Sequence, residues 1–93
     1  MNDKISIARV AELHPKFRQI ATSFITECED TLGIVLRITM GYRSVAEQDA
    51  LYAQGRTAPG KVVTDARGGQ SFHNFGLAID LVRMQGTLPD WEY

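Results

Sequence analysis

Residues 71–80 read SFHNFGLAID, and this stretch decides the fold because a polar turn runs directly into an apolar segment. The apolar run over residues 77–82 predicts a strand. Asp80 lies inside this run, where Ala78 and Val82 would share its face. Burying a carboxylate among apolar side chains is unfavourable unless a cation, a metal or several hydrogen-bond donors hold it. The sequence therefore predicts a strand whose acidic residue has a partner.

His73 is a candidate for that partner, and it stands seven residues before Asp80. An odd separation would place the two side chains on opposite faces of one continuous strand. Gly76 offers a point where the strand can break, so that His73 swings from a preceding turn onto the side of Asp80. A neutral imidazole and a carboxylate that converge in this way are two reasonable zinc ligands. The spacing alone equally fits a surface histidine and a carboxylate that accepts hydrogen bonds.

The N-terminal half of the chain predicts two helices followed by a strand. A long helix is predicted over 15–32, with Pro15 in its first turn and Gly33 as its C-terminal cap. A shorter helix is predicted over 5–13, and the β-branched run over 34–40 predicts a strand. The apolar stripe of the long helix comprises Phe17, Ile20, Ala21, Phe24, Ile25, Cys28 and Leu32, and that of the short helix comprises Ile7, Val10 and Ala11.

A further helix is predicted to start at Ser44, because residues 44–47 have the Ser-x-x-Glu pattern of a capping box. Gly55 is predicted to end this helix, and residues 56–70 are glycine- and proline-rich enough to predict an extended functional loop. The buried side of the helix is predicted to consist of Ala46, Ala50, Leu51 and Tyr52.

Length and composition limit the fold and the partners. The 93 residues predict a single small domain over 1–93. Ten basic and eleven acidic residues give a net charge of -1, which does not indicate a nucleic-acid partner. Cys28 is the single cysteine, so no internal disulfide forms and a metal site must use histidine and carboxylates. The sequence shows no signal peptide and no membrane span, which predicts production in the cytoplasm.

Several short motifs together resemble the LAS-type (M15) zinc peptidases. These are GYRS at 41–44, EQ at 47–48, LY at 51–52, GRT at 55–57 and S-x-H-x-x-G-x-A-x-D at 71–80. The family includes D-alanyl-D-alanine carboxypeptidases and dipeptidases of the VanY and VanX kind, and the L-alanyl-D-glutamate endolysins of bacteriophages. The resemblance runs from about His14 to Asp80, which is most of the chain.

The resemblance implies a fold, a cofactor and site residues. The fold is expected to be α+β and Hedgehog/D-Ala-D-Ala peptidase-like, with helices on one side of a small, mainly antiparallel sheet whose inner face carries the metal. His73 and Asp80 would be zinc ligands. Arg43 would sit beside the scissile carbonyl and stabilise negative charge on its oxygen. Gln48 and Ser71 would line the substrate cleft.

Structural alternatives exist for three of these residues. Arg43 could form a salt bridge to Asp80 or to an acidic residue near the helix that is predicted to start at Ser44. Gln48 equally fits an amide on a helix surface, and Ser71 equally fits a turn hydroxyl. Tyr52, which falls in one of the motifs, is interpreted as core packing.

The resemblance stops short of a complete site. The family carries a third histidine ligand, preceded by an acidic general base, near its C-terminus, and no acidic-x-x-His element follows Asp80. Asp90 and Glu92 are not followed by a histidine, and His14 precedes the long helix, where an N-cap or surface role is expected. The chain is therefore interpreted as a fragment or a natural truncation, or as one whose second copy supplies the missing ligands. An unfinished sheet edge would also allow self-association.

Two functions follow from the resemblance. The first is a zinc-dependent peptidase of the bacterial cell wall, which cleaves a bond next to a D-amino acid in the peptidoglycan stem peptide, of the L-Ala-D-Glu or D-Ala-D-Ala type. Without a signal peptide it would act on the wall once released, as phage or prophage endolysins do. The alternative is a catalytically silent, truncated relative that acts as a cell-wall binding or interaction module. The Hedgehog signalling domain shares the scaffold, so the fold alone does not decide.

Overall fold

The computed structural model describes residues 1–90. Helices and strands alternate irregularly along the chain, and a short 3-10 helix, η1, precedes the last two strands. The elements are α1 (Lys4–Ala11), α2 (Pro15–Leu32), β1 (Val35–Met40), α3 (Val45–Ala53), η1 (Phe72–Phe75), β2 (Asp80–Gln85) and β3 (Leu88–Asp90).

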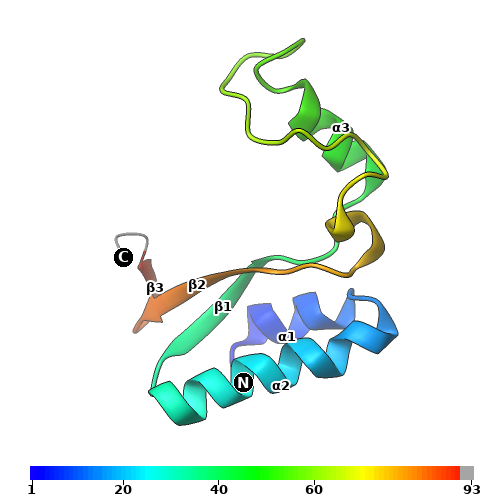
Figure 1. Ribbon diagram of the computed structural model, residues 1–93. Coiled ribbons are helices and arrows are strands. Elements are labelled where there is room, and N and C mark those ends of the chain that lie inside the picture. Colours follow the sequence, from blue (N-terminus) through cyan, green and yellow to red (C-terminus); the bar gives the residue numbers. More distant parts are fainter. Residues whose placement is uncertain (91–93) are drawn as a thin grey trace.

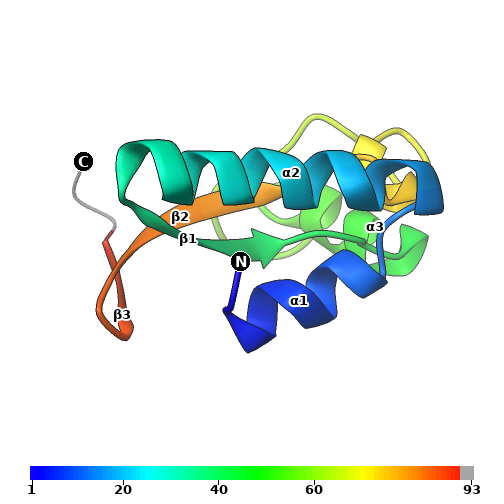
Figure 2. The ribbon, with the colours of Figure 1, turned by 90° about the horizontal axis from the view of Figure 1, so that it is seen from below.

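The three strands form one antiparallel sheet in the order β1-β2-β3. Helices α1 and α2 make a layer beneath this sheet, whereas α3 and the loop that follows it stand at the opposite end of the molecule (Figures 1 and 2). The α+β fold with a small antiparallel sheet is thus confirmed. The strand β3 was not among the predicted elements, because only three residues pair there.

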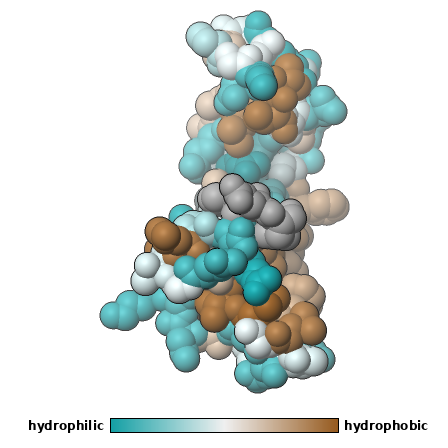
Figure 3. Space-filling view, turned by 90° about the vertical axis from the view of Figure 1, so that its left-hand side faces the viewer, coloured by the Kyte–Doolittle hydropathy of each residue, from teal (hydrophilic) through white to brown (hydrophobic). Residues whose placement is uncertain are grey.

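The core lies between α2 and the sheet. Ile25 of α2 packs with Leu36 and Ile38 of β1, and all three are buried. The predicted bounds of α2 are confirmed, with Pro15 in its first turn and Gly33 in the left-handed conformation at its end. The predicted stripe is only partly covered, since Ile20, Phe24 and Leu32 are exposed. Figure 3 shows hydrophobic side chains at the surface over both the helical layer and the α3 end.

Helix α1 covers the free edge of β1 through polar contacts. The buried Ser6 hydroxyl accepts a hydrogen bond from the Ile38 amide at 2.9 Å, and Arg9 donates to the Ile38 carbonyl. The predicted apolar face of this helix is wrong at Ile7, which is 48% exposed. The reason is that a strand edge presents amides and carbonyls, which need polar partners and not apolar cover.

An ion pair anchors the start of α1 to β1. Asp3 caps α1 through the Ser6 amide and accepts two hydrogen bonds from Arg37, at 2.8 and 3.1 Å. Arg37 and then the Ser6 bonds outweigh the effect of burial and lower the pKa of Asp3 to about 2. The carboxylate form is therefore favoured by folding.

We expect this pair to make stability depend on acid pH. Because the folded pKa lies below the unfolded value, Asp3 contributes stability above about pH 4, and this contribution is lost as the pH falls towards 2. A shift of this size corresponds to about 1–2 kcal/mol for a partly exposed pair. Urea unfolding between pH 2 and 5 should show a smaller loss for Arg37→Met than for the wild type. Arg83→Ala, which removes an exposed arginine from β2, is the control, and an equally small loss there would contradict the assignment.

The helix α3 begins as predicted but buries a different side. The Ser44–Glu47 capping box is present, and the helix ends at Ala53, capped by Gln54 and not Gly55. Ala46 and Ala50 are exposed, whereas Gln48 is fully buried. The predicted buried side is therefore wrong at both alanines. Gln48 is buried in place of the alanines because the inner side of α3 faces polar backbone groups of the following loop. An amide side chain can form hydrogen bonds with these groups and an alanine cannot.

The strand β2 begins at Asp80, three residues later than the run over 77–82 predicts. Its register with β1 shifts between Ile38 and Met40, and the Met40–Asp80 pair is the last of the ladder. Asp80 is therefore the first residue of β2, and 58% of its side chain is exposed, so the expectation of a carboxylate inside the apolar strand is wrong. No helix within residues 1–90 is long and apolar enough to cross a membrane.

Candidate metal and active site

The turn η1 brings His73 to the start of β2. Ser71 caps η1, its hydroxyl accepting a hydrogen bond from the His73 amide at 3.2 Å. Gly76 ends it with a φ of 67° and reverses the chain. The Gly76 carbonyl then accepts a hydrogen bond from the His14 amide at 3.0 Å, which docks the turn onto the N-terminus of α2. The predicted break of the strand at Gly76 is confirmed.

The position of Gly76 tolerates no side chain. A Cβ there would stand 2.5 Å from the His14 amide nitrogen, in a left-handed conformation that L-residues adopt reluctantly. Gly33 has nearly the same φ, 66°, but a Cβ added there would have nothing within 4 Å. A substitution at Gly33 therefore measures the cost of the left-handed conformation without a steric clash. We expect Gly33→Ala to lower the free energy of unfolding by about 1 kcal/mol. Gly76→Ala should lower it by about 1–3 kcal/mol more, because backbone must shift. Equal losses in urea unfolding would contradict the packing argument.

The side chains of His73 and Asp80 converge. His73 Nε2 lies 3.6 Å from Asp80 Oδ2, and only 13% of the His73 side chain is exposed. The other ring nitrogen, Nδ1, lies 2.7 Å from the Gly41 carbonyl oxygen. Since a carbonyl oxygen can only accept, Nδ1 donates to it, and Nε2 is the ring nitrogen that faces the carboxylate. The structure thus places His73 inward and not in a surface turn.

This arrangement fits a metal ion. Metal-binding histidines commonly donate their second nitrogen to a carbonyl or carboxylate, as Nδ1 does to Gly41. Two donors that are each about 2.0–2.1 Å from a tetrahedral zinc ion are about 3.4 Å apart. The observed 3.6 Å between His73 Nε2 and Asp80 Oδ2 is close to that separation. The pair therefore has the geometry of two ligands.

The pair lies on the face of β2 turned away from the helices. Side chains alternate along a strand, and Leu81 packs against the core cluster, so Asp80 and Val82 point to the opposite face. Val82 and Met84 on this second face are themselves buried, so it is not a purely polar face. The expectation that the inner face of the sheet carries the metal stays a prediction.

A third ligand is not found within residues 1–90, where no group of three or more histidine, cysteine or acidic side chains is placed to hold a metal. His14 caps α2 as expected, its Nδ1 accepting from the Lys16 amide at 3.1 Å. Cys28 packs against the core. The Asp90 carboxylate accepts a hydrogen bond from Gln85 at 2.9 Å. Glu92 lies outside the described residues.

Arg43 lies between β1 and α3, next to His73. Its amide donates to the His73 carbonyl at 2.9 Å, and its guanidinium donates to the Gln48 side chain at 2.8 Å. Within residues 1–90 Arg43 forms no salt bridge, so the alternative pairing with Asp80 is not observed. Its buried Nε has no hydrogen-bond partner there either. The guanidinium is therefore held in place by the Gln48 amide. Its charge also acts on the Glu47 carboxylate, whose pKa is lowered by the Ser44 hydrogen bonds and, to a smaller extent, by Arg43.

Gln48 stands behind Arg43. It is fully buried, accepts from Arg43 through Oε1, and donates through Nε2 to the Ala66 carbonyl at 2.8 Å and to the Thr64 hydroxyl at 3.4 Å. It is therefore neither a surface amide nor a group open to solvent. Arg43 also lines a cleft of about 340 Å³, together with Met40, Glu47, Ala50, Leu51 and Gln54.

One buried polar residue of the site was missed by the sequence reasoning. Asn74, which is 9% exposed, completes a capping box with Ser71 at the start of η1. The available signal was the Ser-x-x-Asn spacing, which has the form of a capping box with asparagine in place of the usual glutamate or glutamine.

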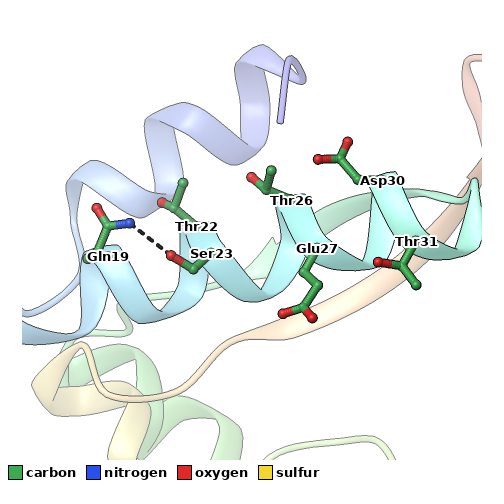
Figure 4. A pocket seen from close by; sticks show the side chains of 7 residues that line it. All are labelled: Gln19, Thr22, Ser23, Thr26, Glu27, Asp30 and Thr31. Atoms are coloured by element: carbon green, nitrogen blue, oxygen red, sulfur yellow. Dashed lines mark hydrogen bonds between the residues drawn. The ribbon is translucent and has the colours of Figure 1, made fainter.

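A larger hollow, of about 460 Å³, lies along the surface of α2, remote from His73. Its lining comes from one helix, with a single hydrogen bond between Gln19 and Ser23 at 2.8 Å. Figure 4 shows these side chains spread along α2. The hollow therefore offers no converging groups for chemistry. Its lining residues are Gln19, Thr22, Ser23, Thr26, Glu27, Asp30 and Thr31.

Comparison with known proteins shows which family the chain belongs to. The family profile VanY, D-alanyl-D-alanine carboxypeptidase, matches residues 10–90. The chain is also similar to the peptidoglycan L-alanyl-D-glutamate endopeptidase CwlK of Bacillus subtilis (strain 168), with 48% identity over 86 residues, covering 89% of this chain and 51% of that protein. The chain thus spans about half the length of this curated relative. The matched region includes α2, α3, η1 and the whole sheet, and it begins at the last residues of α1. The chain therefore belongs to the VanY family.

Proposed function

We propose that this chain carries part of the active site of a zinc-dependent peptidase that acts on the stem peptide of peptidoglycan. The observation that carries the proposal is the pairing of His73 Nε2 with Asp80 Oδ2 at 3.6 Å, with Arg43 joined to the same turn by a backbone hydrogen bond. The family match and the endopeptidase relative support the same class of reaction.

In this proposal His73 and Asp80 hold the metal. A bound zinc ion would polarise the scissile carbonyl and lower the pKa of a bound water. The Gly41 carbonyl keeps the proton on His73 Nδ1, so that Nε2 stays available as a ligand. Asp80, exposed at the first position of β2, supplies a carboxylate oxygen beside His73 Nε2.

Arg43 is proposed to stabilise the negative charge that develops on the carbonyl oxygen. Its guanidinium forms no salt bridge within residues 1–90, and Arg43 lines the cleft beside Glu47, where it is proposed to meet the substrate. Gln48 is proposed to contribute to the substrate cleft by orienting Arg43 from behind, since its own amide is fully buried. Ser71, half-buried beside His73, is proposed to line the cleft while its hydroxyl caps η1.

The bond cleaved is proposed to be the L-Ala-D-Glu bond. The relative that is 48% identical is named for that endopeptidase activity, whereas the family description names a D-alanyl-D-alanine carboxypeptidase. The protein would then act on the cell wall after release from the cytoplasm, in the manner of an endolysin.

A second candidate function is a wall-binding module without hydrolysis. The observation that favours it is that residues 1–90 place two metal-binding side chains together and no third. Two ligands bind zinc weakly, and hydrolysis needs a general base in addition.

The test is incubation of the protein, expressed from its own gene and supplied with one equivalent of zinc, with purified muropeptides. Mass spectrometry distinguishes cleavage of the L-Ala-D-Glu bond from loss of a terminal D-Ala. We expect the former, and its abolition by a chelator with recovery on adding zinc. Binding of muropeptides without any cleavage would establish the second candidate, and loss of D-Ala alone would reassign the bond.

A further inference from the structure

Asn74 uses its whole side-chain amide to join three segments of the site. Its Oδ1 accepts from the Gly69 amide at 2.9 Å and from the Ser71 amide at 3.3 Å. Its Nδ2 donates to the Arg43 carbonyl at 2.9 Å and to the Ser44 carbonyl at 3.3 Å. A buried side chain with every hydrogen-bonding position filled is held in one orientation.

These contacts fix Arg43 relative to His73. The Arg43 amide donates to the His73 carbonyl at 2.9 Å, and His73 Nδ1 bonds to the Gly41 carbonyl at 2.7 Å. Within residues 1–90, Asn74 makes the only side-chain hydrogen bonds between η1 and the carbonyls of Arg43 and Ser44. The segment that carries the guanidinium and the turn that carries the imidazole are therefore tied together at adjacent residues.

The chemistry of this position requires an amide. An aspartate would retain the acceptor for the Gly69 and Ser71 amides, and so the cap of η1, but it has no donor for the two carbonyls. Its charge would instead repel the carbonyl oxygens of Arg43 and Ser44. A leucine would satisfy neither side.

We infer that Asn74 is a positioning residue, which holds the Arg43 guanidinium at the correct distance from the metal-binding turn. The inference rests on the proposed peptidase function, because Arg43 matters to turnover only there. A displacement of about 1 Å at a reacting group can lower turnover about 100-fold, and partners behind the reacting groups typically contribute 10–100-fold in activity or metal affinity.

The test is a double-mutant cycle of Asn74→Asp with Arg43→Ala, in the protein expressed from its own gene and loaded with zinc. We expect Asn74→Asp alone to lower kcat by about 10–100-fold, with one zinc still bound and with KM changed less than kcat. In the Arg43→Ala background the same substitution should lower kcat no further. An equal loss in both backgrounds, or no loss in either, would overturn the inference.

A measurement without substrate separates this inference from the proposed function. The Arg43 Nε–H signal in a ¹H–¹⁵N spectrum, assigned by its loss in Arg43→Lys, should shift and exchange faster with water in Asn74→Asp. Gln70→Glu is the matched control, since it makes the same amide-to-acid change at an exposed loop residue whose Oε1 accepts from Arg67. An unchanged Arg43 signal in Asn74→Asp overturns the inference even when no peptide is hydrolysed. If Asn74→Asp does not fold, Asn74→Ser, which keeps one donor and acceptor, replaces it in both measurements.

Discussion

Replacing His73 with alanine is expected to lower the zinc affinity of the protein by more than about 100-fold. Loss of a partner behind a ligand already lowers affinity 10–100-fold, and His73 supplies a ligand atom itself in the proposed site. The exposed Asp80 carboxylate would then be the sole remaining ligand of the pair. Equilibrium dialysis against a buffered zinc solution, with the bound metal measured by mass spectrometry, gives the affinity directly.

The matched control for this prediction is His14→Ala. His14 is exposed at the N-terminus of α2 and caps the helix through the Lys16 amide, so its loss should lower stability by about 1 kcal/mol and leave zinc binding unchanged. If His14→Ala loses the metal and His73→Ala retains it, the assignment of ligands is wrong.

Replacing Arg43 with alanine is expected to lower kcat by about 100–1000-fold while zinc remains bound. This range is the usual loss when one group that stabilises a developing oxyanion is removed. The metal should remain because neither His73 Nε2 nor Asp80 Oδ2 contacts the guanidinium, whose described partner is Gln48. Turnover of a muropeptide and zinc content are measured on the same preparation.

Two further variants make this prediction specific. Arg83→Ala removes a positive charge from an exposed position on β2 and should leave turnover unchanged. Arg43→Lys keeps the charge but not the planar fork of donors, and it should fall between the wild type and the alanine variant. Full turnover in Arg43→Ala would remove Arg43 from the site.

The local elements were predictable because their signals are short-range. The Ser44 capping box, the Pro15 start and the Gly33 cap each depend on contacts within one helical turn, and all three are present. The convergence of His73 and Asp80 was also predictable, because Gly76 is the one residue between them that adopts a left-handed turn without strain.

The burial of individual side chains was less predictable because it depends on distant segments. The exposure of Asp80 follows from the register shift opposite Met40, which no residue next to Asp80 signals. The burial of Gln48 follows from a loop carbonyl 18 positions along the chain, at Ala66. Asn74 was missed for the same reason, since its donors reach Arg43 and Ser44 across about 30 residues of sequence.

The polar contacts of α1 with β1 close one edge of the sheet to further strands. With the Ile38 amide and carbonyl already bonded to Ser6 and Arg9, the outer side of β1 has no backbone groups at its centre with which to recruit another strand. Within residues 1–90, the β3 edge is therefore the edge of the sheet that α1 leaves uncovered. We expect any assembly through the sheet to add a strand at that edge, so that a cross-linker placed on β3 would report it whereas one placed on β1 would not.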